Sequence, residues 1–270
     1  MNPKDILIEL NKKYNFSSSI ISNVDTHIYS NDDMYIDGEE KHYYGVGFSC
    51  LDIIRSALMS SDVSKKSINS VLIFPCGYGR ELRFIKEYFL QAKITGGEIS
   101  EEKTKFVSEH FIINTFQSKR NFQKIELDKK FDLIWCGSLF THISAKNFKK
   151  LLRFFVEHLN DNGLLMFTTC GRYVKERFDS FKYGLRFLPR IYVKAKYSIL
   201  GFGYTSYLKQ YRYGVSLSNP SWVLKQIEKY EDIRMTGFLE KNGTLIRMLQ
   251  FVRKKTYLIK NCFKFTIPDK

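Results

Sequence analysis

The clearest chemical signal in the sequence is a glycine-rich turn followed, in the next apolar run, by a carboxylate. The run Val71–Phe74 ends in Pro75-Cys76-Gly77-Tyr78-Gly79, and Glu98 stands 21 residues (98 − 77) after Gly77. Glycine has no β-carbon, so Gly77 and Gly79 allow bare backbone to approach a ligand. In a strand–helix–strand unit, a carboxylate at this distance reaches the hydroxyls of a ribose. The pattern therefore predicts a site for a ligand of the adenosine type, without identifying it.

Alternating strand and helix patterns surround this turn. Apolar runs end at Phe74, Ile99, Cys136 and Thr169, and apolar residues at helical spacing lie between them. Such alternation predicts an α/β fold with a doubly wound, Rossmann-like parallel sheet. The helices expected with their signals are 48–59, 82–89, one starting after Ser100, 148–159 stopped by Asn160–Gly163, and one starting at Asn219-Pro220.

The last two predicted strands close the sheet differently. They span 233–239 and 244–252 and are joined through Asn242-Gly243, which is a strong hairpin signal. We therefore expect a terminal antiparallel hairpin, which does not suit a dinucleotide-binding half. The third glycine of the dinucleotide pattern is also missing, since Glu81 and Leu82 follow Arg80. Both features argue against NAD.

Several blocks resemble those of class I S-adenosylmethionine-dependent methyltransferases. Residues 71–80 resemble the first motif of that family, in a variant with Pro-Cys-Gly in place of Gly-Cys-Gly. Residues 131–142 resemble its fourth strand and following loop, and residues 162–169 its fifth strand. Tyr213–Ser216 and Asn219–Trp222 further resemble methyltransferases of bacterial cell-surface polysaccharide gene clusters. The resemblance implies a seven-stranded sheet and S-adenosyl-L-methionine as the cofactor.

The resemblance also assigns the cofactor site. Gly77 and Gly79 would pass under the methionine part, Glu98 would hold the ribose, and Cys136 and Gly137 would lie near the sulfonium. The family usually has an acidic residue, which helps to hold the cofactor's ammonium group, where Ile73 stands here. The complete set expected to bind the cofactor is Pro75, Cys76, Gly77, Tyr78, Gly79, Glu98, Ile99, Cys136 and Gly137.

His142 is the candidate catalytic residue. Methyl transfer from a sulfonium is a direct displacement that needs alignment of donor and acceptor, and a hydroxyl acceptor also needs a general base. His142 follows the fourth strand, at the sheet edge where ligands bind, and histidine titrates near neutral pH. The competing interpretation is a loop histidine that orients the backbone or touches the cofactor. Gly137-Ser138-Leu139-Phe140 stands where nucleobase amino-methyltransferases usually carry Asn/Asp-Pro-Pro-aromatic, which disfavours base methylation.

Residues 171–214 carry the second informative pattern. Ten basic residues there face only Glu176 and Asp179, and twelve tyrosines and phenylalanines are interleaved with them. Aromatic faces stack on sugars or bases, and arginine binds phosphate or carboxylate. We therefore expect a substrate-recognition insertion, with Arg172, Tyr173 and Tyr213 as acceptor-binding candidates. An anionic glycan, a lipid-linked saccharide or an RNA would each fit.

Composition sets the broad class. The net charge of +15 favours an anionic partner. Five cysteines without a CxxC pair argue against a disulfide framework or zinc site, and no metal is predicted. No signal peptide or membrane-spanning run is recognisable, so we expect a cytoplasmic protein. Peripheral contact with the inner face of the membrane is a second expectation. The predicted division is a helical extension or lid (1–69), the methyltransferase domain (70–253) and a basic tail (254–270).

The sequence thus favours a methyltransferase that O-methylates a sugar hydroxyl of a cell-surface glycan or its precursor, with an anionic or carrier-linked acceptor. Two alternatives stay open. The net charge of +15 also suits an RNA or other nucleic-acid methyltransferase. Ile73 and Pro75, which depart from the family pattern, also suit a non-catalytic binding module with the same fold.

Overall fold

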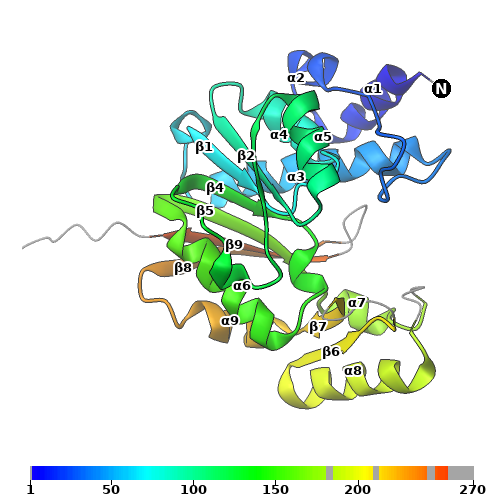
Figure 1. The fold of residues 1–270 in the computed structure, drawn as a ribbon, viewed down its shortest axis with the longest axis vertical. Helices are drawn as coiled ribbons and strands as arrows, with labels where there is room; N and C mark the ends of the chain where they lie inside the picture. Colours follow the sequence, from blue (N-terminus) through cyan, green and yellow to red (C-terminus); the bar gives the residue numbers. More distant parts are fainter. Residues whose placement is uncertain (1, 181–184, 209–212, 242–246, 255–270) are drawn as a thin grey trace, which may run out of the picture.

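The computed structural model describes residues 2–180, 185–208, 213–241 and 247–254, and its centre is a seven-stranded sheet (Figure 1). The strand order is β3-β2-β1-β4-β5-β9-β8. The strands are β1 (Ser70–Ile73), β2 (Lys93–Glu98), β3 (Asn114–Gln117), β4 (Phe131–Cys136), β5 (Leu159–Thr169), β8 (Ile233–Lys241) and β9 (Arg247–Lys254).

The first five strands pair in parallel, and β9 pairs antiparallel with both β5 and β8. This arrangement confirms the predicted doubly wound, Rossmann-like α/β sheet with a terminal antiparallel pair. The predicted turn at Asn242-Gly243 lies outside the described residues.

Helices cover both faces of the sheet. They are α1 (Pro3–Tyr14), α2 (Ser18–Asn23), α3 (Glu40–Ser60), α4 (Leu82–Tyr88), α5 (Glu101–Phe111), α6 (Ala145–Glu157), α7 (Arg172–Glu176), α8 (Phe187–Leu200) and α9 (Pro220–Ile227). Side chains alternate along β1, so Val71 and Ile73 join one core while Leu72 and Phe74 join the other. The predicted caps are present: the side chains of Ser100 and Asn219 accept from the backbone N–H of Lys103 and Trp222.

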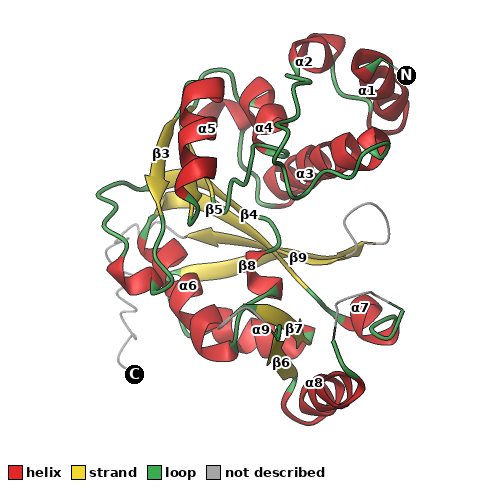
Figure 2. Cartoon of the chain, turned by 45° about the vertical axis from the view of Figure 1, so that its right-hand side comes forward, coloured by secondary structure: helices red, strands yellow, loops and turns green. Residues whose placement is uncertain are grey.

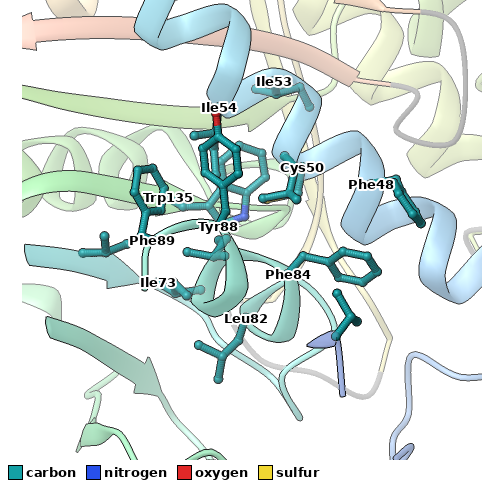
Figure 3. Packing of buried hydrophobic residues seen from close by; sticks show 14 of the residues in the cluster. Phe48, Cys50, Ile53, Ile54, Ile73, Leu82, Phe84, Tyr88, Phe89 and Trp135 are labelled. Atoms are coloured by element: carbon teal, nitrogen blue, oxygen red, sulfur yellow. The ribbon is translucent and has the colours of Figure 1, made fainter. Parts of the chain in front are cut away.

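The helix predicted over residues 48–59 begins eight residues earlier (48 − 40), at Glu40. The added turns are stabilised by burial rather than by intrinsic preference, since Tyr43 and Tyr44 are almost completely buried. Figure 3 shows Phe48 and Cys50 of α3 packed near Phe84 of α4 and Trp135 of β4, in the core between α3 and the sheet.

A second prediction is wrong: residues 160–163 do not end the preceding helix. Helix α6 ends at Glu157, and β5 already begins at Leu159, which pairs with Phe131. The register then shifts before Leu164 pairs with Leu133. The Asn160 amide donates to Asp132 Oδ1 at 2.7 Å. These polar residues therefore belong to the irregular first part of β5, which pairs with β4. The sequence pattern predicts the end of a helix at the same place.

A small second sheet follows the fifth strand. Strands β6 (Phe202–Ser206) and β7 (Gly214–Ser218) pair antiparallel. Together with α7 and α8 they form what we call the β6–β7 unit, which has its own core around Val174, Val193 and Leu217. The unit lies at the opposite side of the molecule from α1 and α2 (Figure 2). Its core is small, so most of α8 stays exposed.

Candidate functional site

The glycine turn after β1, Pro75–Gly79, has the shape that a ligand-binding site needs, and we call this turn the cradle. Gly77 and Gly79 have φ of +54° and +87°, in the left-handed region that favours glycine. A β-carbon on Gly77 would meet no protein atom within 4 Å, whereas one on Gly79 would lie 2.4 Å from the Phe111 ring. Gly77 therefore leaves space above the turn, and Gly79 allows α5 to pack against it.

Glu98 lies at this cradle, as predicted. It is buried at the end of β2. Its Oε2 accepts from the Gly77 N–H at 3.2 Å, and its Oε1 accepts from the N–H of Ile99 at 2.7 Å and of Ser100 at 3.4 Å. These backbone donors fix the carboxylate at the turn. A carboxylate offers about four acceptor positions, so it retains capacity for ribose hydroxyls. The Ile99 side chain beside it is exposed.

The predicted cysteines are buried thiols. Burial, reinforced by the charge of Glu98, raises the pKa of Cys76 to about 12. Burial, with a further contribution from Glu81, raises the pKa of Cys136 well above its ordinary value. Because the thiolate is the nucleophilic form, both side chains serve packing at the turn and at the end of β4. Neither is suited to covalent catalysis.

Glu81 joins the site although no sequence motif singles it out. Trp135 Nε1 donates to Glu81 Oε2 at 2.8 Å. A β-carbon on Gly137, directly after β4, would lie 2.7 Å from the same oxygen. A carboxylate thus stands between the glycine turn and the end of β4, while the strand position Ile73 has none. The available signal was an acidic residue two positions after Gly79.

The segment before α3 covers the turn from outside. Tyr29 stacks on the buried Tyr78, with ring centroids 5.0 Å apart. The buried Arg83 of α4 donates to the carbonyl oxygens of Asp25 and His27 at 3.1 and 2.7 Å. Residues N-terminal to the sheet are therefore attached to the cradle. Pro75, half-buried, begins the turn.

His142 follows the short helix Leu139–Thr141 at the end of β4. Its Nδ1 lies 2.7 Å from the Gly214 carbonyl oxygen, and the Gly214 N–H donates to the His142 carbonyl at 2.9 Å. Because a carbonyl only accepts, Nδ1 carries the proton and Nε2 is the acceptor nitrogen of the neutral ring. The Tyr213 ring stacks on the imidazole with centroids 4.7 Å apart. The structure thus brings two of the predicted residues together.

The other acceptor candidates lie elsewhere. The Arg172 guanidinium pairs with Glu240 of β8, Nη2 to Oε2 at 2.7 Å. Tyr173 lies beneath the Arg177 guanidinium at 3.8 Å from its ring centroid. Arg172 therefore joins α7 to the main sheet, on an exposed part of the surface.

Within the described residues, no group of three His, Cys, Asp or Glu side chains is placed to hold a metal ion. No helix in the described part of the chain has the length and apolar character needed to cross a membrane.

Comparisons with known proteins agree with this geometry. Residues 72–165 match the family model described as a methyltransferase domain. No curated protein matched the sequence. Among solved structures, DesVI of Streptomyces venezuelae is similar at a TM-score of 0.55 and 16% identity, over 85% of this chain and 100% of that one.

Two other similar structures differ in the chemistry that they carry. N-methyltransferase NodS of Bradyrhizobium japonicum, solved with S-adenosyl-L-homocysteine, has a TM-score of 0.52 at 10% identity, over 92% and 98% of the two chains. An O-methyltransferase family protein of Burkholderia thailandensis has a TM-score of 0.50 at 9% identity, over 94% and 72%. Residues 72–165 thus match a methyltransferase domain, which indicates S-adenosylmethionine as the cofactor, and the wider chain shares the fold of methyltransferases of known structure. The acceptor atom is not fixed by these likenesses.

Proposed function

We propose that this protein is an S-adenosylmethionine-dependent O-methyltransferase that acts on a sugar hydroxyl of a glycan or its precursor. The choice of an oxygen as the methyl-accepting atom rests on the geometry of His142. Its ring is oriented by the Gly214 carbonyl at 2.7 Å, so that Nε2 is the proton-accepting nitrogen at the carboxyl end of the sheet. An oriented neutral imidazole is what deprotonation of a hydroxyl requires.

When bound, the cofactor supplies a methyl group that is already activated by the positive sulfur. The chain's residues position both reactants. Gly77 leaves room for the cofactor, Glu98 accepts from the ribose hydroxyls, and the Glu81 carboxylate receives the ammonium group in place of an acid at position 73. The residues present therefore fit the cofactor despite Ile73.

The acceptor side carries out the proton transfer. With the cofactor bound, its methyl group would pass to the acceptor oxygen, and His142 Nε2 would take the hydroxyl proton that this oxygen loses. Tyr213 and Tyr207 lie 4.7 and 6.2 Å from the imidazole, measured between ring centroids. Aromatic faces of this kind pack against the apolar face of a sugar ring.

Nucleic acid is the second candidate acceptor, favoured by the net charge of +15. One assay distinguishes the two candidate acceptors by the methylated product that each would give. Purified protein and methyl-labelled cofactor are incubated with a glycan extract and with an RNA extract, and the products are hydrolysed. The glycan proposal expects label in a base-stable methyl ether of a monosaccharide. Label in nucleotides alone would contradict the glycan, and binding without any transfer would favour the non-catalytic module.

A further inference from the structure

Helix α8 exposes an unusual amount of apolar surface. Only Val193 and Tyr197 of its fourteen residues are buried, on the side that packs against Val215 and Leu217. Leu188 and Ile199 are 74% and 79% exposed. The other large apolar residues exposed on the helix are Phe187, Ile191, Tyr192 and Leu200.

Most of the exposed apolar residues form one stripe. Leu188, Tyr192, Ala195 and Ile199 follow one another at spacings of four, three and four, which places them on a single helix face. Phe187 and Ile191 widen that stripe. They also line a cavity of about 600 Å³ beside α7 that includes Lys175 and Lys194.

Basic side chains flank the stripe on both sides. At about 100° per residue, Lys196 falls on one flank and Lys194 on the other. Lys194 pairs with Asp179 at 2.7 Å, and Lys196 lies 5.6 Å from the Tyr192 ring centroid. An apolar face bordered by lysines and a tyrosine has the pattern of a helix that lies in a membrane interface.

We propose that α8 binds the surface of an anionic lipid bilayer, with its apolar stripe at the headgroup–acyl boundary and its basic flanks on lipid phosphates. Charge selects this occupant over a second copy of the chain. Two copies meeting through this face would bring Lys194 and Lys196 of each together, and within 171–214 acids are few. Like charges in such an interface oppose association, whereas an anionic surface attracts the same lysines.

The position of α8 gives this contact a consequence. Helix α8 packs on β6, and β7, the partner of β6, begins at Gly214, which holds His142. A bilayer bound at the outer face of α8 therefore lies against the same small unit that holds His142. An acceptor attached to a lipid carrier would be presented there; that consequence rests on the proposed function, whereas the lipid contact does not.

The test is cosedimentation of the full chain with vesicles of phosphatidylcholine, with and without phosphatidylglycerol. Wild type should bind the anionic vesicles and not the neutral ones. The double variant L188Q/I199Q should lose at least about tenfold in partitioning. K194Q and K196Q should each lose about fivefold, an effect that salt should mask.

A matched control is L90S/I112S, which removes two exposed apolar side chains (71% and 86% exposed) outside the β6–β7 unit. This variant should bind vesicles like wild type. Thermal unfolding and affinity for S-adenosylhomocysteine, both unchanged in L188Q/I199Q, would exclude misfolding and keep the result independent of acceptor chemistry.

Three outcomes would overturn the proposal. Failure of the wild type to bind anionic vesicles would remove the lipid partner. Binding of L188Q/I199Q at the wild-type level would place the lipid contact elsewhere in the chain. A dimer that is detected by light scattering and that L188Q/I199Q dissociates would make a second copy the occupant of the stripe.

Discussion

The cradle after β1 and the β6–β7 unit are held together in different ways and suit different ligands. The cradle is held by backbone geometry: two left-handed glycines, a buried carboxylate that accepts from three N–H groups, and aromatic packing from α5. The β6–β7 unit has a small core, an exposed helix and side chains facing outward. A rigid site suits an invariant cofactor, whereas surface side chains on a small scaffold suit an acceptor that differs between enzymes.

Substitutions in the cradle and in the β6–β7 unit should therefore have different effects. Changes in the cradle should weaken cofactor binding with no acceptor present. Changes around His142 and in the β6–β7 unit should leave that binding intact and alter turnover or acceptor affinity. His142 is the sharpest case, since it joins the loop after β4 to the start of β7.

The largest effect is expected for His142→Ala. Turnover should fall by about 100-fold or more, because the acceptor hydroxyl loses its base. Affinity for S-adenosylhomocysteine by calorimetry should stay within error. His142→Gln retains a donor for the Gly214 carbonyl and lacks the base, so it should be as slow. Full turnover in the Gln variant would mean that the ring only positions β7.

Glu98→Ala should produce the next largest effect. Loss of the carboxylate leaves the ribose hydroxyls unpaired, at a cost of about 1–3 kcal/mol in cofactor affinity. Calorimetry with S-adenosylhomocysteine measures it. NAD should not bind the wild type detectably; NAD binding as tight as that of S-adenosylhomocysteine would place the protein in a different class.

Glu81→Gln should discriminate between ligands. The variant keeps the acceptor for Trp135 Nε1 and loses only the charge. Affinity for S-adenosylhomocysteine should fall about tenfold, as expected for a charge-assisted contact. Affinity for 5′-methylthioadenosine, which lacks the amino-acid part and its ammonium group, should not change. Glu98→Gln is the matched control, because it should weaken both ligands; equal losses in Glu81→Gln would indicate a merely structural carboxylate.

The sequence predicts the cradle better than the β6–β7 unit, for physical reasons. A buried parallel strand must be apolar and a close turn needs glycine, so Val71–Gly79 shows its structure locally. Strand β3 has half-exposed residues at the sheet edge, and β6 and β7 are short and rich in glycine, serine and threonine. Such strands are specified by their partners rather than by their own pattern.

Side-chain placement shows the same limit. Glu98 could be predicted, because it ends a strand at a fixed distance from the turn. Glu81 could not, because its role depends on Trp135 Nε1 and on the missing β-carbon of Gly137, more than fifty residues along the chain. The pairing of Arg172 with Glu240 is also a tertiary contact. The aromatic and basic composition alone gave no indication of this pairing.

Arg172 supplies the smallest expected effect and the sharpest test of the outer region. If its guanidinium binds an anionic group of the acceptor, Arg172→Ala should raise the acceptor KM about two- to fivefold, the scale of an exposed ionic contact. Added salt should reduce the difference from wild type, since it screens that contact. Cofactor affinity should not change, because Arg172 lies outside the cradle.

Glu240→Gln decides between two roles for the same side chain. In the structure Arg172 pairs with Glu240 through both its backbone N–H and its guanidinium. If Arg172 serves the acceptor, removing the competing carboxylate charge frees the guanidinium, so KM should stay level or fall. If the pair only joins α7 to β8, Arg172→Ala and Glu240→Gln should raise KM equally and lower thermal stability together. A guanidinium that binds the acceptor thus predicts a KM that rises in Arg172→Ala and does not rise in Glu240→Gln, because only the charge of Arg172 is used. A purely structural pair predicts a KM that rises in both variants, because each substitution breaks the same contact.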